Sequence, residues 1–375
     1  MKANIILAMF VIVLFGCVKD EDKVKIQTIN GLKIYKNKNL ITNSEMKFDL
    51  KQILEINGIN SDSLMNFLSP LGLCIDSKEN VFILDVKSSS IKKFDQEGDF
   101  VKSIGRQGMG PGEMMYPNNI LLLNDTLFVL TSTSQIVSFD NDGNYIKTTK
   151  ISSIPQIIKS NNSTMVGLVQ KQEMKEDGLY IGSEVVVFDN NFNEIKTLDQ
   201  KMFKITTNDI QINYLDLIIP FCISKDEIFV SSNSEDIYKI NVYDLKGNII
   251  YSIEKEYVKT KFSEEESLEF NNMITKAKFP SKYRPKYKKA INNLFVDYEN
   301  VLFVSSSINR KVNDKNVYFD IFKDKTYLNT KEINIYEGSD YFSFENLLYF
   351  RNGKMYFLSN SNDANLKIYE YKLNP

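Results

Sequence analysis

The residues of this chain whose types and spacing could bind a ligand fall in two segments, and the first is rich in glycine. Glycines let backbone N–H groups approach an anion, and Arg106 adds a positive charge. The segment is not a phosphate-binding P-loop, because the Gly-Lys-Ser/Thr ending is absent and no helix is expected after it. In the alternative interpretation, Arg106 and Glu113 brace a tight connection between neighbouring structural units. The candidate ligand-binding residues here are Arg106, Gln107, Gly108, Gly110, Gly112 and Glu113.

The second segment, residues 257–289, places basic side chains beside aromatic rings. Ser263 with Glu266 three residues later is a capping-box pattern, which predicts a helix that extends to about Ala277. Basic groups beside aromatic rings could hold an anionic or glycan ligand by charge and stacking. Alternatively, the aromatic rings cap the fold and the lysines are solvated. The expected inward stripe of the helix is Leu268, Met273 and Ile274, the candidate ligand-binding residues are Tyr283, Arg284 and Tyr287, and the basic residues around them are Lys278, Lys282, Lys286, Lys288 and Lys289.

Whole classes of chemistry are excluded by what the composition lacks. The chain has no histidine, which removes Ser–His–Asp and Cys–His catalysis and histidine metal sites. Residues 140–144 hint at a calcium loop, but the terminal bidentate glutamate is missing and a hairpin turn is the better interpretation. We therefore predict no catalytic residue, no metal and no cofactor. The net charge of −2 argues against a nucleic-acid partner.

The elements that must position these segments recur along the chain. A hydrophobic residue followed by Asp-x-x-Gly precedes the final strand of a repeated unit of apolar runs, with aspartates at 95, 140, 189 and 244, although Gly is replaced in the third copy. Asp and Gly favour tight hairpin turns through side-chain bonding and positive φ. Two further units keep the order of strands without this turn. Six units of about 45 residues, each with four strands, predict an all-β fold, a six-bladed β-propeller of antiparallel blades.

The sixth unit has only three predicted strands before the chain stops. A strand from the N-terminal segment, within residues 26–56, would complete it and remove an open edge. One short helical insertion is expected between blades four and five. The alternative to this architecture is a β-sandwich whose turns coincide by chance.

The glycine-rich string also carries a family resemblance. Gly105-Arg106-Gln107-Gly108-Met109-Gly110-Pro111-Gly112-Glu113 resembles the hallmark of a Bacteroidetes family of six-bladed β-propeller lipoproteins that is related to NHL-repeat propellers. The segment from Tyr283 to Tyr287, followed by a strand with Val296 and Asp297, resembles the same family. The resemblance covers roughly Leu50 to the C-terminus. The resemblance implies a fold and a cellular location rather than a reaction.

The N-terminus indicates export. Lys2 precedes an apolar run over residues 5–15, which is too short for a membrane span but suits a signal peptide. Leu14-Phe15-Gly16-Cys17 resembles a lipobox, so Cys17 is the predicted lipidation site; a secretory signal with an incidental cysteine is the alternative. The acidic residues 20–22 resemble a surface-export signal or form an ordinary linker. We therefore expect a signal peptide (1–16), a lipidated linker (17–25) and a propeller (26–375), anchored through Cys17 in the bacterial outer membrane and facing the cell surface.

Loop lengths indicate which face of the propeller binds. Connections from first to second and from third to fourth strands are short, and they share one face. The long insertions (105–116, 171–183, 257–289 and 305–316) fall on the opposite face, where binding residues tend to gather. Cys74 and Cys222 occupy equivalent places in opposite blades, so we expect free, buried thiols.

Three functions remain open from the sequence. The first is a surface-tethered binding module or scaffold that engages a glycan, a peptide or an envelope protein through the long-loop face. The second is a histidine-independent lyase or hydrolase with Tyr, Arg and carboxylate groups at the channel mouth, although no carboxylate pair stands out. The third is a structural subunit of an envelope complex.

Overall fold

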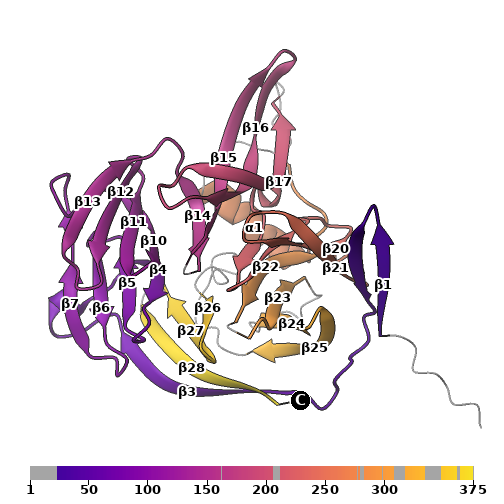
Figure 1. Cartoon of the computed structure of the whole chain (residues 1–375), viewed down its shortest axis with the longest axis horizontal. Helices are drawn as coiled ribbons and strands as arrows, with labels where there is room; N and C mark the ends of the chain where they lie inside the picture. Colours follow the sequence, from indigo (N-terminus) through magenta and orange to yellow (C-terminus); the bar gives the residue numbers. More distant parts are fainter. Residues whose placement is uncertain are drawn as a thin grey trace, which may run out of the picture.

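The computed structural model describes residues 23–161, 163–205, 212–276, 278, 283–297, 299–307, 317–333, 348–360 and 364–374. These residues form six sheets around one axis (Figure 1), which confirms the predicted six-bladed β-propeller. We number the sheets as blades I to VI, and the first strand of each blade lies nearest the axis. Blade I contains β4 (Pro70–Ile75), β5 (Val81–Asp85), β6 (Ser90–Phe94) and β7 (Phe100–Ile104); blade II contains β10 (Pro117–Leu123), β11 (Thr126–Thr131), β12 (Gln135–Asp140) and β13 (Tyr145–Lys150); blade III contains β14 (Pro155–Ser160), β15 (Met165–Lys175), β16 (Gly178–Phe188) and β17 (Glu194–Lys204).

The remaining blades repeat the same antiparallel order. Blade IV contains β18 (Phe221–Ile223), β19 (Glu227–Ser231), β20 (Tyr238–Asp244) and β21 (Ile249–Lys255); blade V contains β22 (Ile291–Val296), β23 (Leu302–Ser306), β24 (Val317–Lys323) and β25 (Thr326–Ile333); blade VI contains β26 (Leu348–Arg351), β27 (Lys354–Ser359), β28 (Asn365–Asn374) and β3 (Lys47–Asn57).

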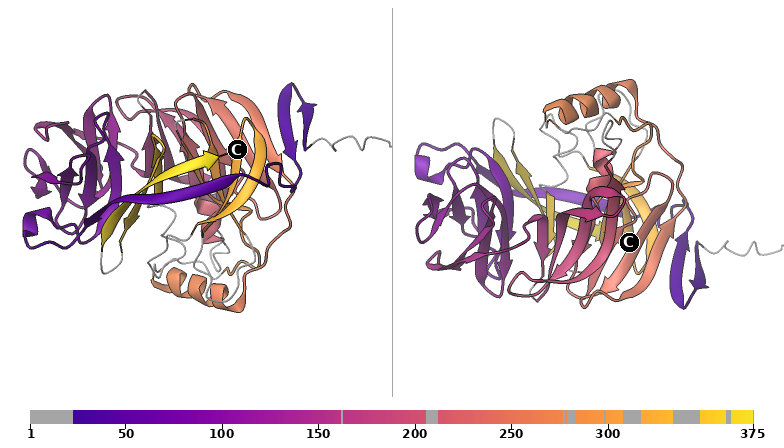
Figure 2. Two further views of the ribbon diagram at one scale, coloured as in Figure 1. Left: turned by 90° about the horizontal axis from the view of Figure 1, so that it is seen from below. Right: turned by 90° about the horizontal axis from the view of Figure 1, so that it is seen from above.

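Blade VI closes the ring by joining the two ends of the described chain. β28 pairs antiparallel with β3, in a register that runs from Asn365 opposite Asn57 to Asn374 opposite Lys47. The two strands lie side by side in Figures 1 and 2. This confirms that an N-terminal strand completes the sixth blade. The pairing gives blade VI the same four-strand order as the other blades and ties the C-terminal strand to the N-terminal part of the chain.

An N-terminal hairpin adds two strands that the sequence did not predict. β1 (Val24–Ile29) pairs with β2 (Leu32–Asn37), and β2 pairs parallel with β21, so blade IV has six strands. The buried Asn37 fixes this addition. Its amide nitrogen donates to the carbonyl oxygens of Glu254 and Lys325, and its Oδ1 accepts the N–H of Tyr327. One side chain therefore links the hairpin to blades IV and V.

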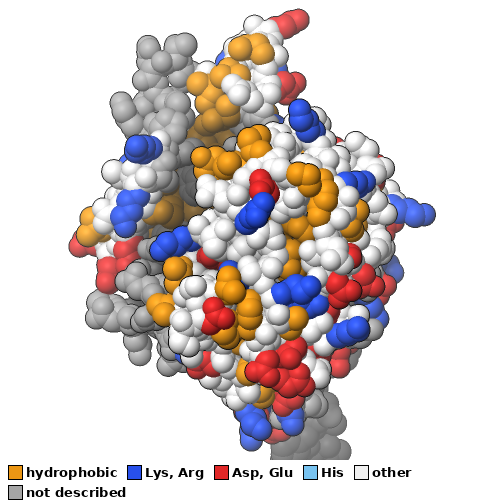
Figure 3. All heavy atoms as spheres, turned by 90° about the vertical axis from the view of Figure 1, so that its left-hand side faces the viewer, with side chains coloured by type: hydrophobic (Ala, Val, Ile, Leu, Met, Phe, Trp, Pro, Cys, Tyr) orange, Lys and Arg blue, Asp and Glu red, His pale blue; other side chains and the backbone are white. Residues whose placement is uncertain are grey.

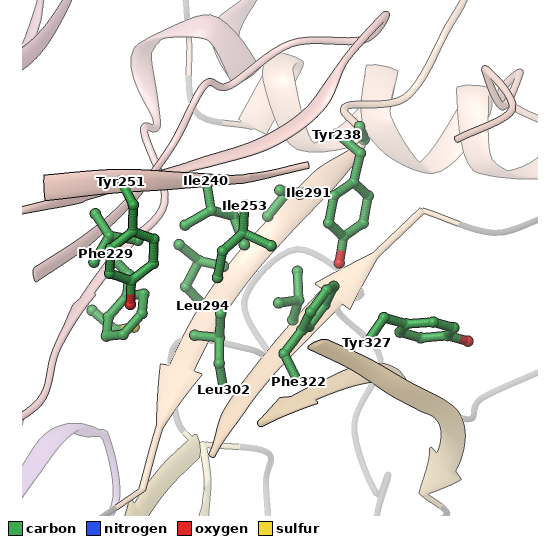
Figure 4. Close-up of a cluster of buried hydrophobic side chains, with 14 residues drawn as sticks. Phe229, Tyr238, Ile240, Tyr251, Ile253, Ile291, Leu294, Leu302, Phe322 and Tyr327 are labelled. Carbon is green, nitrogen blue, oxygen red and sulfur yellow. The ribbon is translucent and has the colours of Figure 1, made fainter. Parts of the chain in front are cut away.

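The hydrophobic core lies between neighbouring blades rather than inside any one of them. Between blades IV and V, Phe229 and Ile240 pack with Leu294 and Phe322 (Figure 4). All five residues of β5 are buried, as expected for a strand that is covered on both faces by neighbours. Each large side chain buried in this way contributes about 1.5–3 kcal/mol. A single blade could not bury these faces alone, so the ring is required.

A buried ion pair accompanies the core between blades IV and V. Lys255 Nζ lies 2.8 Å from an Asp320 carboxylate oxygen, and both side chains are more than 90% buried. The lysine also lies over the rings of Tyr238 and Tyr327, at 5.3 and 4.3 Å from their centroids. Thr330 donates a hydrogen bond to the other carboxylate oxygen. Lys255 and Thr330 thus meet one carboxylate oxygen of Asp320 each, and the ion pair offsets part of the cost of burying two charges.

The repeated aspartates form hairpin turns between third and fourth strands. In blade II, Asp140 Oδ1 accepts the N–H of Asn144, and Oδ2 accepts its side-chain amide. This confirms the turn interpretation of residues 140–144. In blade III, Phe192 stands where the other copies have Gly and adopts φ of +62°. Its ring packs against Phe128 of blade II, 5.3 Å between centroids, which compensates for the strained backbone.

Two predictions about local structure need correction. Residues 171–183 are not a loop: β15 and β16 continue as a paired hairpin to Lys175 opposite Gly178, and this hairpin projects from the ring in Figure 1. Cys74 and Cys222 are free thiols, as predicted, and both border the axial channel, but only Cys222 is fully buried and Cys74 is partly exposed. Most of the predicted insertion 305–316 lies outside the described residues. No helix in the described residues is long and apolar enough to cross a membrane.

Candidate functional site

The long connections lie on one face, as expected. Antiparallel strands return to the same face after every second turn, so second-to-third and blade-to-blade connections share a side. The connections 58–69, 105–116, 205–220 and 256–290 all belong to that side, which we call the long-loop face. Figure 2 shows α1 (Glu264–Lys276) standing clear of the disc there. The opposite side, the plain face, has only turns such as 124–125 and 245–248.

The glycine-rich connection folds around its own glutamate. β8 (Arg106–Gln107) pairs parallel with β9 (Glu113–Met114), which brings Arg106 to Glu113 at 2.9 Å. Glu113 also accepts the N–H of Gly110 at 2.8 Å. The amide and the guanidinium together hold the pKa of Glu113 below its usual range. A Cβ at Gly108, which has φ of +151°, would lie 2.1 Å from the Glu113 carboxylate, so glycine is required there.

This geometry bears on the predicted anion site. The internal Glu113 carboxylate already bonds the N–H of Gly110 and the guanidinium of Arg106, which were the donors expected to meet an external anion. Most of the Arg106 side chain, 80%, nevertheless faces solvent. Gln107 is exposed beside it, and Gly112 adopts φ of +73° at the end of the turn. The ligand-binding role of this segment stays a prediction. The ion pair between Arg106 and Glu113, on which the alternative interpretation depends, is present.

The helical insertion forms as the capping box predicts. The N–H of Glu266 donates to Ser263 Oγ, and the N–H of Ser263 donates to the Glu266 carboxylate. The prediction of its inward stripe was partly wrong. Phe270 and Ile274 are the buried residues of α1, whereas Leu268 is 61% exposed. The inward face of α1 therefore consists of Glu266, Phe270 and Ile274, at i, i+4 spacing, and does not include Leu268.

Several of the basic residues after the helix hold the insertion in place. Lys288 pairs with Glu266 of α1, and Lys289 pairs with Asp216 of the 3₁₀ helix η2 (Tyr214–Leu217). Both lysines are buried, so they are not part of a solvated patch. Lys259 Nζ already lies over the ring of Tyr287, 4.0 Å from the ring centroid. Lys282 lies outside the described residues.

Tyr283 and Arg284 remain at the surface of this insertion. Tyr283 is 36% exposed, Arg284 is exposed, and the Arg284 guanidinium donates to the carbonyl oxygen of Tyr283 at 2.9 Å. The glycine-rich connection joins blades I and II, and this insertion joins blades IV and V, three junctions away around the ring. The structure therefore places the two candidate segments on one face but across the axis from each other.

The axial channel has a lining that the sequence did not reveal. It has a volume of about 370 Å³ and is lined by the first strands of all six blades. Its lining is mainly Leu, Ile and Phe, with Lys159 and Arg351 as its charged residues and Gln156 among its polar ones. Burial lowers the pKa of Lys159 and raises that of Cys222, on the neighbouring strand, to about 12. A repeat alignment could have found Lys159, because the equivalent residue is Cys74 in blade I and Cys222 in blade IV.

Charges elsewhere do not form a continuous field. On the side of blades I and II, side chains of both signs are interspersed with apolar ones (Figure 3). In the described part of the chain, no group of three or more Cys, Asp or Glu residues is placed to hold a metal ion.

Comparisons with known proteins give a family, a sequence relative and structures similar to this chain. The chain is 22% identical over 133 residues to the protein brain tumor of Drosophila melanogaster, a match that covers 34% of this chain and 12% of that protein. A solved Bacteroides fragilis protein described as exported has a TM-score of 0.53 at 14% identity, covering 91% of this chain and all of the other. A Bacteroides vulgatus protein from a domain family of unknown function has a TM-score of 0.49 at 14% identity, covering 87% and 98%. Residues 66–345 match the family described as 6-bladed beta-propeller, and the chain belongs to that family.

Proposed function

We propose that this protein is an exported, lipid-anchored binding module that engages a glycan, a peptide or an envelope protein through its long-loop face. The observation that carries the proposal is the asymmetry of the ring. Apart from the segment 38–46 that leads into β3, the long connections between strands of the ring in the described residues leave the same face, while the strands are joined on the other face by short turns. A rigid scaffold with extended connections on one side is the usual arrangement of a binding surface.

The anchor is the first part of this proposal. The lipobox-like sequence ends at Cys17, and residues 18–46 separate that cysteine from the closing strand β3. Two acyl chains would hold the protein stably on a membrane, because each buried CH₂ contributes about 0.8 kcal/mol. The Bacteroides fragilis protein of similar fold is described as exported, which fits the export proposed for this chain. Residues 1–16 would then be the cleaved signal, and the mature protein would face the cell surface.

Metabolic labelling with an alkyne fatty acid tests the anchor. In a Bacteroidetes host, wild-type protein should carry the label and fractionate with the outer membrane, and surface proteolysis should remove it from intact cells. Cys17→Ala should lose the label and accumulate as precursor. A labelled Cys17→Ala variant, or an unlabelled wild type, would show that Cys17 is not the acylated residue.

Binding on the long-loop face is the second part. The mature chain should be applied to glycan and peptide arrays, together with Arg106→Ala and Tyr283→Ala. The control is Lys246→Ala, in an exposed plain-face turn. At least one long-loop variant should weaken a confirmed ligand about tenfold, while the control binds normally. Normal binding by both long-loop variants would place the ligand elsewhere.

A hydrolase is less well supported by the geometry. Glycoside hydrolysis needs two carboxyl groups about 5–10 Å apart on either side of a bound sugar. The axial channel contains neither Asp nor Glu in the lining that the structure describes. The binding proposal therefore takes precedence over the alternative of a histidine-independent enzyme.

A further inference from the structure

The innermost strand of each blade has an edge that faces the axis and has no strand to pair with. Its carbonyl oxygens must be satisfied by other means. Neutral side chains from the adjacent blade do this at several places. Asn119 donates to the carbonyl oxygen of Gln156 at 3.0 Å, and Ser160 donates to that of Leu122 at 3.0 Å. Asn and Ser are thus sufficient to link one blade to the next.

Lys159 makes the same kind of link but carries a charge into the channel. Its Nζ donates to the carbonyl oxygen of Phe221 at 2.8 Å and lies 5.2 and 5.6 Å from the ring centroids of Phe221 and Phe295. No carboxylate among the described residues forms an ion pair with it. One of the three ammonium donors is used by the carbonyl, and the others have room to reach a ligand in the channel.

The second cation of the lining has a different electrostatic environment. Arg351 belongs to blade VI, opposite blade III in the ring, and donates to the carbonyl oxygen of Ile75 at 2.5 Å. Lys354, which pairs with Glu79 at 2.5 Å, lowers the pKa of that carboxyl, and the charge of Arg351 adds to the effect. Arg351 thus acts on a carboxyl group that Lys354 already pairs with. Around Lys159 the neighbours are the two aromatic rings and the protonated thiol of Cys222.

A buried cation without a counter-charge is costly unless a ligand supplies the charge. The channel volume of about 370 Å³ lies within the range of small-molecule sites, about 300–1,000 Å³. Lys159 has no ion-pair partner among the described residues and so matches a carboxylate, and the Leu, Ile and Phe lining matches an apolar skeleton.

We propose that the axial channel binds a small organic monocarboxylate, whose carboxylate accepts hydrogen bonds from Lys159 Nζ and whose carbon skeleton lies against Phe295 and the neighbouring aliphatic residues. This site does not involve the long-loop face, so a failed test of the channel would leave the proposed binding module unaffected.

The test uses the mature protein and defined probes. Isothermal titration calorimetry should be run with hexanoate, benzoate and phenylacetate, against hexanamide and inorganic phosphate, at concentrations up to about 10 mM. At least one carboxylate should bind saturably, and hexanamide should not. Lys159→Met, which keeps the length of the side chain without its charge, should weaken binding about 10- to 100-fold.

Lys93→Met is the matched control. Lys93 Nζ also donates to a carbonyl oxygen, that of Asn141, at 2.8 Å and lies 5.2 Å from the ring of Phe82, but it does not line the channel. This variant should bind the carboxylate like the wild type. Binding should also take up protons above neutral pH, seen as a dependence of the measured heat on the buffer, because the carboxylate raises the lowered pKa of Lys159.

Three results would overturn the proposal. The first is an absence of saturable binding by every carboxylate in wild-type protein. The second is equal binding by Lys159→Met and wild type. The third is tighter binding of phosphate than of any carboxylate, which would indicate a different anion class.

Discussion

Tyr371→Phe should weaken the junction where the closing blade meets blade V. Tyr371, on β28, donates its hydroxyl to Asp297 Oδ2 at 2.6 Å, and both residues are buried. Asp297 Oδ1 accepts the N–H groups of Glu299 and Val301, so the hydroxyl is the side-chain donor to the other oxygen. The ring of Tyr371 packs against Phe303 and would keep that contact as phenylalanine. The substitution thus removes one hydrogen bond and little packing.

The expected cost is about 2 kcal/mol at pH 7. Hydrogen bonds to charged groups contribute about 1.5–3 kcal/mol, and the loss leaves a buried carboxylate oxygen without a donor. Burial raises the pKa of Asp297. A raised folded-state pKa means that this group favours the fold below its unfolded pKa, and that the benefit is lost as pH rises through the folded value. Removing the donor raises that pKa further, so the cost should be larger at pH 7 than near pH 4.

Urea unfolding followed by far-UV circular dichroism measures this, with Asp297→Asn as the background for a double-mutant cycle. In the Asp297→Asn background no charge remains at this position, so Tyr371→Phe should cost clearly less than in wild type. Equal costs in the two backgrounds, or a cost in wild type under about 0.5 kcal/mol, would refute the role assigned to the pair.

Three other predictions concern other parts of the ring. Asn37→Ala should lower the free energy of unfolding by about 2–3 kcal/mol in urea titrations, because the buried N–H of Tyr327 loses its acceptor; an unchanged midpoint would show that the N-terminal hairpin is not fixed by this residue. Cys74 and Cys222 should react with Ellman's reagent at pH 8 only as the protein unfolds, since burial raises both pKa values; rapid native-state reaction would contradict the burial. Lys159→Met should raise the free energy of unfolding at pH 7, because burial lowers the pKa of Lys159 in the folded protein. The stability of the wild type rises with pH wherever the unfolded chain binds more protons than the folded one, so the difference between variant and wild type should shrink as the pH approaches the ordinary lysine pKa. A destabilised variant would mean that the contacts of the amine stabilise the fold by more than its burial costs.

The architecture was predictable because it repeats. Asp95, Asp140, Asp189 and Asp244 each place a hairpin turn at the same point of a blade, so spacing alone locates four blades. The missing strand of blade VI follows from the four strands of every other unit, which leave the sixth unit one strand short. The helix α1 follows from Ser263 and Glu266, whose capping bonds are local.

The details that the sequence did not reveal depend on contacts between distant residues. Lys288 and Lys289 looked like part of a basic patch, but each finds an acidic partner at least 20 residues away. The N-terminal hairpin adds to blade IV by parallel pairing, for which the chain gives no turn signal. Leu268 looked like part of an inward stripe, although Phe270 takes that place. Lys159 becomes visible only when the six innermost strands are aligned around one axis.

The face of the propeller that binds is the central claim, and hydrogen–deuterium exchange on the mature protein tests it most directly. Exchange should be compared with and without the ligand that the arrays select. We predict slower exchange in the connections 105–116 and 257–289 and no change in the opposite turns at 124–125 and 245–248. Protection confined to those opposite turns would contradict the claim.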